Sequence, residues 1–180
     1  MKLKTSFAIL GLFLASFAFS QKLITKTGQV KFLASVPSAV EEVAATNSSV
    51  SAVLDTKTND VATQMIINAF MFKIPLMQEH FNENYLESDK YPKATFRGKI
   101  SDFDFSKLTT DKTNYNIEGD FTMHGVTKHL KILAAIYKAN GKTVISSNFS
   151  IKAEDYNIKI PSVVKQKVTN DIKVWVNFNF

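Results

Sequence analysis

The chain contains no cysteine among its 180 residues. This absence excludes a disulfide framework, thiolate zinc sites, iron–sulfur clusters and cysteine nucleophiles. Arginine occurs only at Arg97, although bidentate recognition of phosphate or guanine depends on arginine. The lysines are scattered, and the G-x-S-x-G, P-loop and glycine-rich dinucleotide motifs are all missing. Nucleic-acid binding and several large enzyme classes therefore receive no support.

The composition is that of an ordinary globular protein. Hydrophobic residues make up 45% of the chain and charged residues 21%, which argues against a disordered or fibrous protein. The length suits one domain. Phenylalanine occurs 15 times, against one tryptophan and five tyrosines. The protein therefore has a large apolar ring surface to bury, and the phenylalanine rings carry no hydrogen-bonding group.

The first 20 residues have the organisation of a cleaved secretory signal. Lys2 and Lys4 precede an apolar run over 7–19, and the small residues Ala18 and Ser20 precede a cleavage site before Gln21. The run is short for a membrane span, and no lipidation cysteine follows it. We therefore predict a periplasmic or secreted protein with one domain over 21–180. Cleavage would lower the formal net charge of +6 by two.

Alternation of apolar and polar residues is the main structural signal of the mature chain, and it is typical of strands with one buried face. In 114–123 the odd-numbered residues are apolar apart from Gly119, which suits a bend or a close approach in a curved sheet. His124-Gly125 and Asn140-Gly141 are predicted hairpin turns. The predicted strands are 28–34, 50–55, 61–67, 94–101, 114–123, 126–137, 144–151 and 172–180.

Two short helices complete the predicted elements. Residues 76–85 carry an apolar helical stripe after Pro75, and a second short helix is predicted over 163–168. About eight closely spaced strands with one or two helices predict an all-β fold, either an antiparallel barrel or a sandwich.

Candidate catalytic or metal-binding groups are few. The histidines are His80, His124 and His129, and none of them has the i, i+4 helical spacing of a zinc pair. A metal site with Glu79 or Glu83 is a minor alternative. Asp102 and Asp104 would share one face of a strand, where repulsion could raise one pKa, although an exposed acidic strand end accounts for them more simply. No metal or cofactor is predicted.

Methionine and phenylalanine are concentrated over 65–81. Such a stretch is typical of an ordinary core, but flexible methionines also line surfaces that accept apolar partners. A barrel of about eight strands either fills its interior with side chains or holds one ligand. The sequence alone leaves both possibilities open.

Three segments resemble the lipid/polyisoprenoid-binding YceI-like family. They are 81–96 (FNENYLESDKYPKATF), 117–128 (IEGDFTMHGVTK) and 149–158 (FSIKAEDYNI). Their order and spacing match that family over nearly the whole mature chain. The resemblance implies an eight-stranded antiparallel lipocalin-like barrel, usually exported, that holds a long isoprenoid or similar lipid in its lumen. We expect a monomer or homodimer with no stable membrane span.

Under this interpretation, alternating apolar residues line the lumen, and a few basic residues contact a head group. The predicted lining residues are Met65, Ile67, Phe72, Met77, Phe81, Phe96, Phe121, Met123, Leu130, Ile132, Phe149 and Trp175. The candidate head-group neighbours are Arg97, Lys128 and His129.

Two other functions remain as alternatives. The apolar alternation from Ile172 to Phe180 is also typical of the last strand of an eight-stranded outer-membrane barrel, whose apolar side chains face lipid. A small hydrolase or metal-binding protein is the third class, and it would depend on the three histidines.

Overall fold

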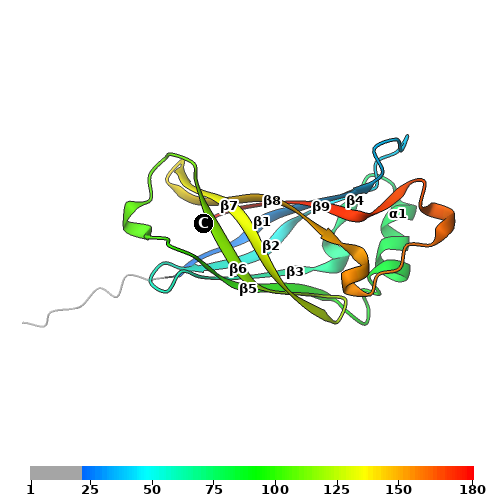
Figure 1. Cartoon of the computed structure of the whole chain (residues 1–180), viewed down its shortest axis with the longest axis horizontal. Coiled ribbons are helices and arrows are strands. Elements are labelled where there is room, and N and C mark those ends of the chain that lie inside the picture. The colour runs from blue at the N-terminus through cyan, green and yellow to red at the C-terminus, as the bar shows by residue number, and fades with distance from the viewer. Residues whose placement is uncertain (1–21) are drawn as a thin grey trace, which may run out of the picture.

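The computed structural model describes residues 22–180, so the predicted signal segment and its cleavage site lie outside the described residues. Eight long strands form an antiparallel barrel (Figure 1). They are β1 (Lys22–Ser35), β2 (Ala44–Asp55), β3 (Asp60–Ile66), β5 (Lys93–Ile100), β6 (Thr113–Met123), β7 (Val126–Ala139), β8 (Lys142–Lys152) and β9 (Val168–Asn179). Each pairs with the next along the chain, and β1 pairs with both β2 and β9 to close the barrel. The eight-stranded lipocalin-like barrel is confirmed.

Both predicted glycine turns are confirmed. His124 and Gly125 have φ angles of 51° and 74°, and Asn140 and Gly141 have 51° and 76°. Two successive positive φ angles are the geometry of a type I′ turn, whose twist matches that of paired strands. These turns join β6 to β7 and β7 to β8, and they fix the register of both hairpins.

The alternating apolar residues face the inside of the barrel. In β9, Val174 and Phe178 are buried, whereas Lys173 and Asn177 are exposed. The outer-membrane interpretation requires the opposite arrangement, with apolar side chains outside. The direction of the alternation therefore gives the barrel an apolar interior.

The predicted helix over 76–85 is found as a short α-helix, α1 (Pro75–His80), continued by a π-helical turn, η2 (Phe81–Tyr85). Pro75 occupies the first turn, where its missing N–H costs nothing. The second predicted helix is only a 3₁₀ turn, η5 (Ser162–Val164), because Val168 already belongs to β9. No helix among residues 22–180 is long and apolar enough to cross a bilayer.

The remaining short elements lie between the long strands. They are the 3₁₀ turns η1 (Ile67–Ala69), η3 (Phe105–Lys107) and η4 (Ala153–Tyr156) and the two-residue strand β4 (Met71–Phe72), which pairs with β2.

The suggested carboxylate pair is not on a strand, because β5 ends at Ile100. Asp104 instead caps η3, where hydrogen bonds from the hydroxyl and backbone N–H of Ser106 lower the pKa of its carboxyl.

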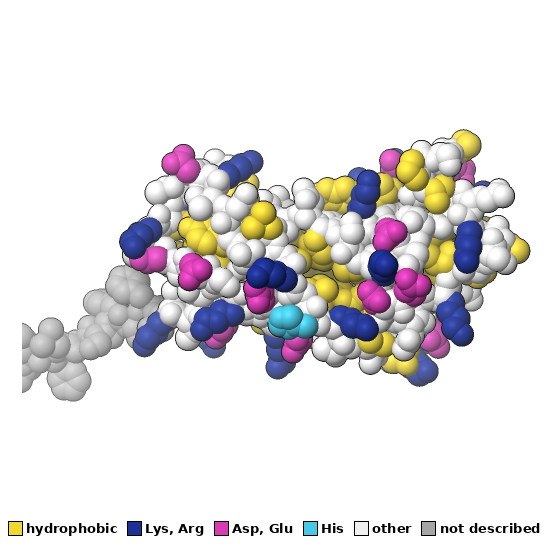
Figure 2. Space-filling model, in the orientation of Figure 1, with side chains coloured by type: hydrophobic (Ala, Val, Ile, Leu, Met, Phe, Trp, Pro, Cys, Tyr) yellow, Lys and Arg dark blue, Asp and Glu magenta, His cyan; other side chains and the backbone are white. Residues whose placement is uncertain are grey.

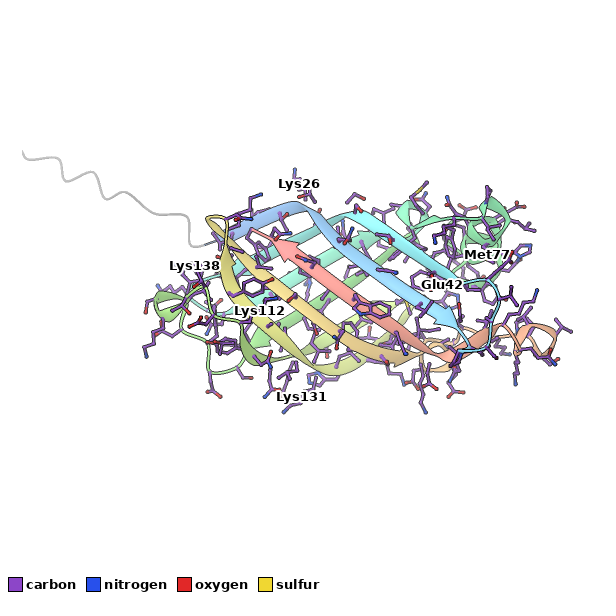
Figure 3. The ribbon with its side chains drawn as sticks, turned by 90° about the horizontal axis from the view of Figure 1, so that it is seen from above. Lys26, Glu42, Met77, Lys112, Lys131 and Lys138 are labelled. Atoms are coloured by element: carbon purple, nitrogen blue, oxygen red, sulfur yellow. The ribbon has the colours of Figure 1, made fainter. Side chains whose placement is uncertain are left out.

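The end of the barrel opposite α1 is filled with side chains. Leu54, Ile100 and Ile136 are fully buried there, and Phe103 and Leu108 from the loop between β5 and β6 cover them. Lys112 and Lys138 lie at this end, whereas Glu42 and Met77 lie at the end with α1 (Figure 3). A ligand could therefore enter only from the α1 end or through the wall.

Candidate ligand-binding cavity

A cavity of about 330 Å³ occupies the end of the barrel covered by α1 and η2. Its wall is almost entirely apolar. The lining residues are Val30, Phe32, Ala34, Val43, Met65, Ile67, Phe70, Phe72, Met77, His80, Phe81, Tyr85, Leu86, Ala94, Phe121, Met123, Phe149, Ile151, Ala153, Ile158, Ile160, Val164, Lys167, Val168, Ile172, Val174 and Val176. The volume lies within the usual range for small-molecule sites, which begins at about 300 Å³.

Strand periodicity produces this wall. Phe32 of β1 and Val174 of β9 are register partners, and both line the cavity. Side chains two apart on a strand share a face, so Val176 and Ile172 line it as well. The outward neighbour Lys173 is exposed.

Four phenylalanines, which we call the phenylalanine cluster, attach α1 and η2 to the barrel: Phe32, Phe70, Phe72 and Phe81. The centroid of the Phe81 ring lies 5.3 Å from that of Phe32, 5.8 Å from Phe70 and 5.1 Å from Phe72. Such ring pairs contribute beyond their buried area. The cluster therefore holds η2 against β1 and β4 and forms part of the cavity wall.

A second, smaller space of about 60 Å³ lies deeper in the barrel. Met65, Phe121, Phe149 and Val176 line both spaces, so the two spaces are neighbours. Polar groups in the smaller space are limited to Thr63 and Ser147. Together the two spaces follow the barrel axis inward from the α1 end and stop at the filled end.

We call the end of the larger cavity that is lined by α1 and the segment 157–167 the mouth. Two exposed basic residues border it there, His80 from α1 and Lys167. Tyr85 is the third ionisable residue in the wall. The interior is thus suited to apolar groups, and basic side chains occur only at the mouth.

Eleven of the twelve predicted lining residues border one of the two spaces. Met65, Ile67, Phe72, Met77, Phe81, Phe121, Met123 and Phe149 line the larger one. Phe96, Leu130 and Ile132 line the smaller one. Trp175 is a correction: it lies between the inward residues Val174 and Val176, so its ring faces outward, 5.7 Å from the Lys31 Nζ.

The three predicted head-group neighbours line neither space. Arg97 follows the inward residue Phe96 on β5 and is therefore exposed on the outer face. His129 is exposed, and its Nδ1 lies 2.9 Å from a carboxylate oxygen of Asp120 on the outer surface. Lys128 is exposed near the end of the β6–β7 hairpin. The structure instead places His80 and Lys167 at the mouth, a juxtaposition that spacing along the chain did not indicate.

His124 joins three segments beside the cavity. Its Nδ1 lies 2.9 Å from the carbonyl oxygen of Tyr156, its Nε2 lies 2.8 Å from a carboxylate oxygen of Glu87, and its ring packs edge-on against Tyr91. Both ring nitrogens therefore have partners in other segments. The side chain thus has structural partners, and among residues 22–180 no three potential metal ligands come together.

Tyr156 is buried beneath the cavity wall, where its ring packs edge-on against Phe121. Its hydroxyl has no hydrogen-bond partner within the described chain. Burial raises the pKa of this phenol from 10.0 to about 12, with a smaller contribution from Asp155. The folded protein therefore favours the neutral phenol, whereas the unfolded chain ionises near pH 10.

Tyr156→Phe is expected to leave stability at pH 7 unchanged or to raise it by about 1 kcal/mol, because the substitution removes a buried polar group without a partner. The wild type should lose stability between about pH 10 and pH 12, as the unfolded state ionises before the folded state does. Tyr156→Phe should lose less over that interval. Urea unfolding across this range measures both effects, with Tyr137→Phe as the control. Equal alkaline losses in wild type and Tyr156→Phe would contradict the assignment.

Comparison with known proteins agrees with this architecture. The barrel is similar to a polyisoprenoid-binding domain from Saccharophagus degradans implicated in plant cell wall breakdown, with a TM-score of 0.74 and 14% identity over 89% of this chain and 98% of that one. It is also similar to Burkholderia cenocepacia BcnA, with a TM-score of 0.68 and 12% identity over 83% of this chain and 94% of that one. The Campylobacter jejuni YCEI protein gives a TM-score of 0.50 and 18% identity over 100% of this chain and 99% of that one.

No curated protein matches the chain significantly. The family model for the YceI-like domain matches residues 15–180. The resemblance detected in the sequence motifs is therefore confirmed, and the chain belongs to the YceI-like domain family.

Proposed function

We propose that this protein is an exported, non-catalytic carrier or sequestering protein for a long apolar lipid, a polyisoprenoid or a similar chain. The observation that carries the proposal is the apolar cavity, which opens at the α1 end and stops inside the barrel. Each methylene that a ligand buries contributes about 0.8 kcal/mol. A long chain could therefore bind tightly with few polar contacts.

Two further observations support the proposal. The structurally similar Saccharophagus degradans domain is described as polyisoprenoid-binding. Catalysis needs a convergent set of polar groups, whereas the cavity wall is built almost wholly from aliphatic and aromatic side chains. Export is inferred from the charged start, apolar run and small residues of 1–20.

Organic extraction of the purified protein, followed by mass spectrometry, tests the proposal. We expect a long-chain lipid to co-purify with the protein. The delipidated protein should then take up a long polyisoprenol supplied in detergent. Repeated recovery of empty protein that takes up no polyisoprenol would overturn the proposal.

A further inference from the structure

Exposed apolar side chains gather around the mouth. Among the described residues, the most exposed large apolar side chains include Val40 at 102%, Met71 at 64%, Leu76 at 57% and Val163 at 87%. Each lies within three residues of a cavity-lining residue, the partners being Val43, Phe72, Met77 and Val164 in the same order. These four, which we call the rim residues, therefore lie close in sequence to the cavity wall, at the end of the molecule that carries α1.

The rim residues come from several segments. Val40 lies in the loop between β1 and β2, Leu76 on α1 and Val163 on η5. In Figure 2, hydrophobic side chains protrude at the end of the molecule where α1 and these loops lie, with charged side chains between them. Exposed apolar side chains with lysines beside them suit the interfacial region of a bilayer, where apolar groups enter the acyl boundary and basic groups contact anionic lipid.

Charge is distributed unevenly around the mouth. Residues 156–170 contain Lys159, Lys165 and Lys167 but no acidic residue. Glu41 and Glu42 lie in the neighbouring loop between β1 and β2, where the backbone N–H of Val36 donates to the carbonyl oxygen of Lys167. Anionic lipid would therefore attract the segment 157–167, which carries Val163, more strongly than the loop beside it.

We infer that the mouth docks on the surface of a lipid bilayer that contains anionic lipid, with Val163 entering the interface and the neighbouring lysines contacting head groups. Docking in this orientation places the open end of the cavity against the apolar medium in which a long lipid dissolves. The inference extends the proposed function, on which it rests for the nature of the cavity's ligand.

Flotation with phosphatidylcholine vesicles, with and without phosphatidylglycerol, tests the docking surface. We expect the protein to float with phosphatidylglycerol-containing vesicles, and we expect Val163→Asp to weaken this binding at least about tenfold, because a charge replaces the inserted apolar group. Lys159→Gln combined with Lys165→Gln should remove most of the preference for phosphatidylglycerol. Raised salt should remove the same preference.

Leu133→Asp is the matched control. Leu133 is a 55% exposed apolar residue on β7, away from the mouth. The wild type and all variants carry the same N-terminal segment, so any effect of its apolar residues on vesicle binding is the same in each. Vesicle binding by Val163→Asp that equals the wild type, or an equal loss with Leu133→Asp, would overturn the docking proposal.

Uptake of polyisoprenol from detergent separates this proposal from the proposed function. Val163→Asp should take up the detergent-dispersed lipid as the wild type does, because its side chain lies outside the cavity wall. A wild type that floats with vesicles but takes up no polyisoprenol would overturn the proposed function and retain the docking surface. A wild type that takes up polyisoprenol normally, together with vesicle binding that Val163→Asp does not weaken, would overturn the docking surface and retain the proposed function.

Discussion

Ala94→Trp is expected to weaken polyisoprenol binding about 60-fold while leaving the barrel folded. Ala94 is a β5 residue that is 1% exposed, lines the larger cavity and is the register partner of Met65. An indole at this position would fill space that a bound chain occupies. Displacing about three methylenes at ~0.8 kcal/mol each corresponds to ~2.4 kcal/mol, or about 60-fold in affinity.

The control for this substitution is Lys99→Trp, which adds the same ring on the same strand but at an exposed position. Its affinity for the lipid should stay within about twofold of the wild type. Titration of delipidated protein measures the affinity, and thermal unfolding of the empty proteins shows whether overpacking has destabilised the barrel. Wild-type affinity in a folded Ala94→Trp protein would show that the lipid does not occupy this cavity.

The strands could be predicted from the sequence because their signal is local. Alternation in 114–123 and 172–180 required one buried face, and Asn140-Gly141 required a type I′ turn. The same alternation found part of the cavity wall, since inward-facing residues of an unfilled barrel are lining residues. Phe96, Phe121 and Phe149 were predicted in this way and border the interior spaces.

The remaining site features depend on contacts between distant segments. Phe70 follows η1 and reaches the cavity only because η1 places it beside Phe32 and Phe81. Ala94 has too small a side chain to stand out in a hydrophobic pattern. His80 and Lys167 are 87 positions apart in the sequence, yet both line the larger cavity.

Trp175 shows how hydrophobicity can mislead when it conflicts with position. Its neighbours Val174 and Val176 face inward, so alternation alone places Trp175 outside. Its apolar character nevertheless led to its inclusion among the lining residues. In this strand, position along the pleat outweighs residue type, and the ring lies over the Lys31 side chain instead of the cavity.

The pairing of β5 with β6 depends on two glycines that face each other, Gly98 and Gly119. A Cβ on Gly119 would overlap the carbonyl oxygen of Arg97 and the Cα of Gly98, and a Cβ on Gly98 would lie 2.5 Å from the carbonyl oxygen of Glu118. These are backbone atoms, which cannot rotate away as a side chain could. The close approach predicted at Gly119 is therefore confirmed.

Gly119→Ala is consequently expected to lower the free energy of unfolding by about 4 kcal/mol or more, because β5 and β6 must separate to admit the methyl group. At 2–4 °C per kcal/mol for a domain of this size, the melting temperature should fall by roughly 8–16 °C. Gly141→Ala is the control, since its Cβ would meet no atom within 4 Å and only its φ of 76° is unfavourable. That strain costs about 1–2 kcal/mol. Thermal unfolding of both variants decides the matter: similar melting temperatures would mean that the two strands can move apart at little cost, and the barrel wall would then be far more deformable than the glycine pair implies.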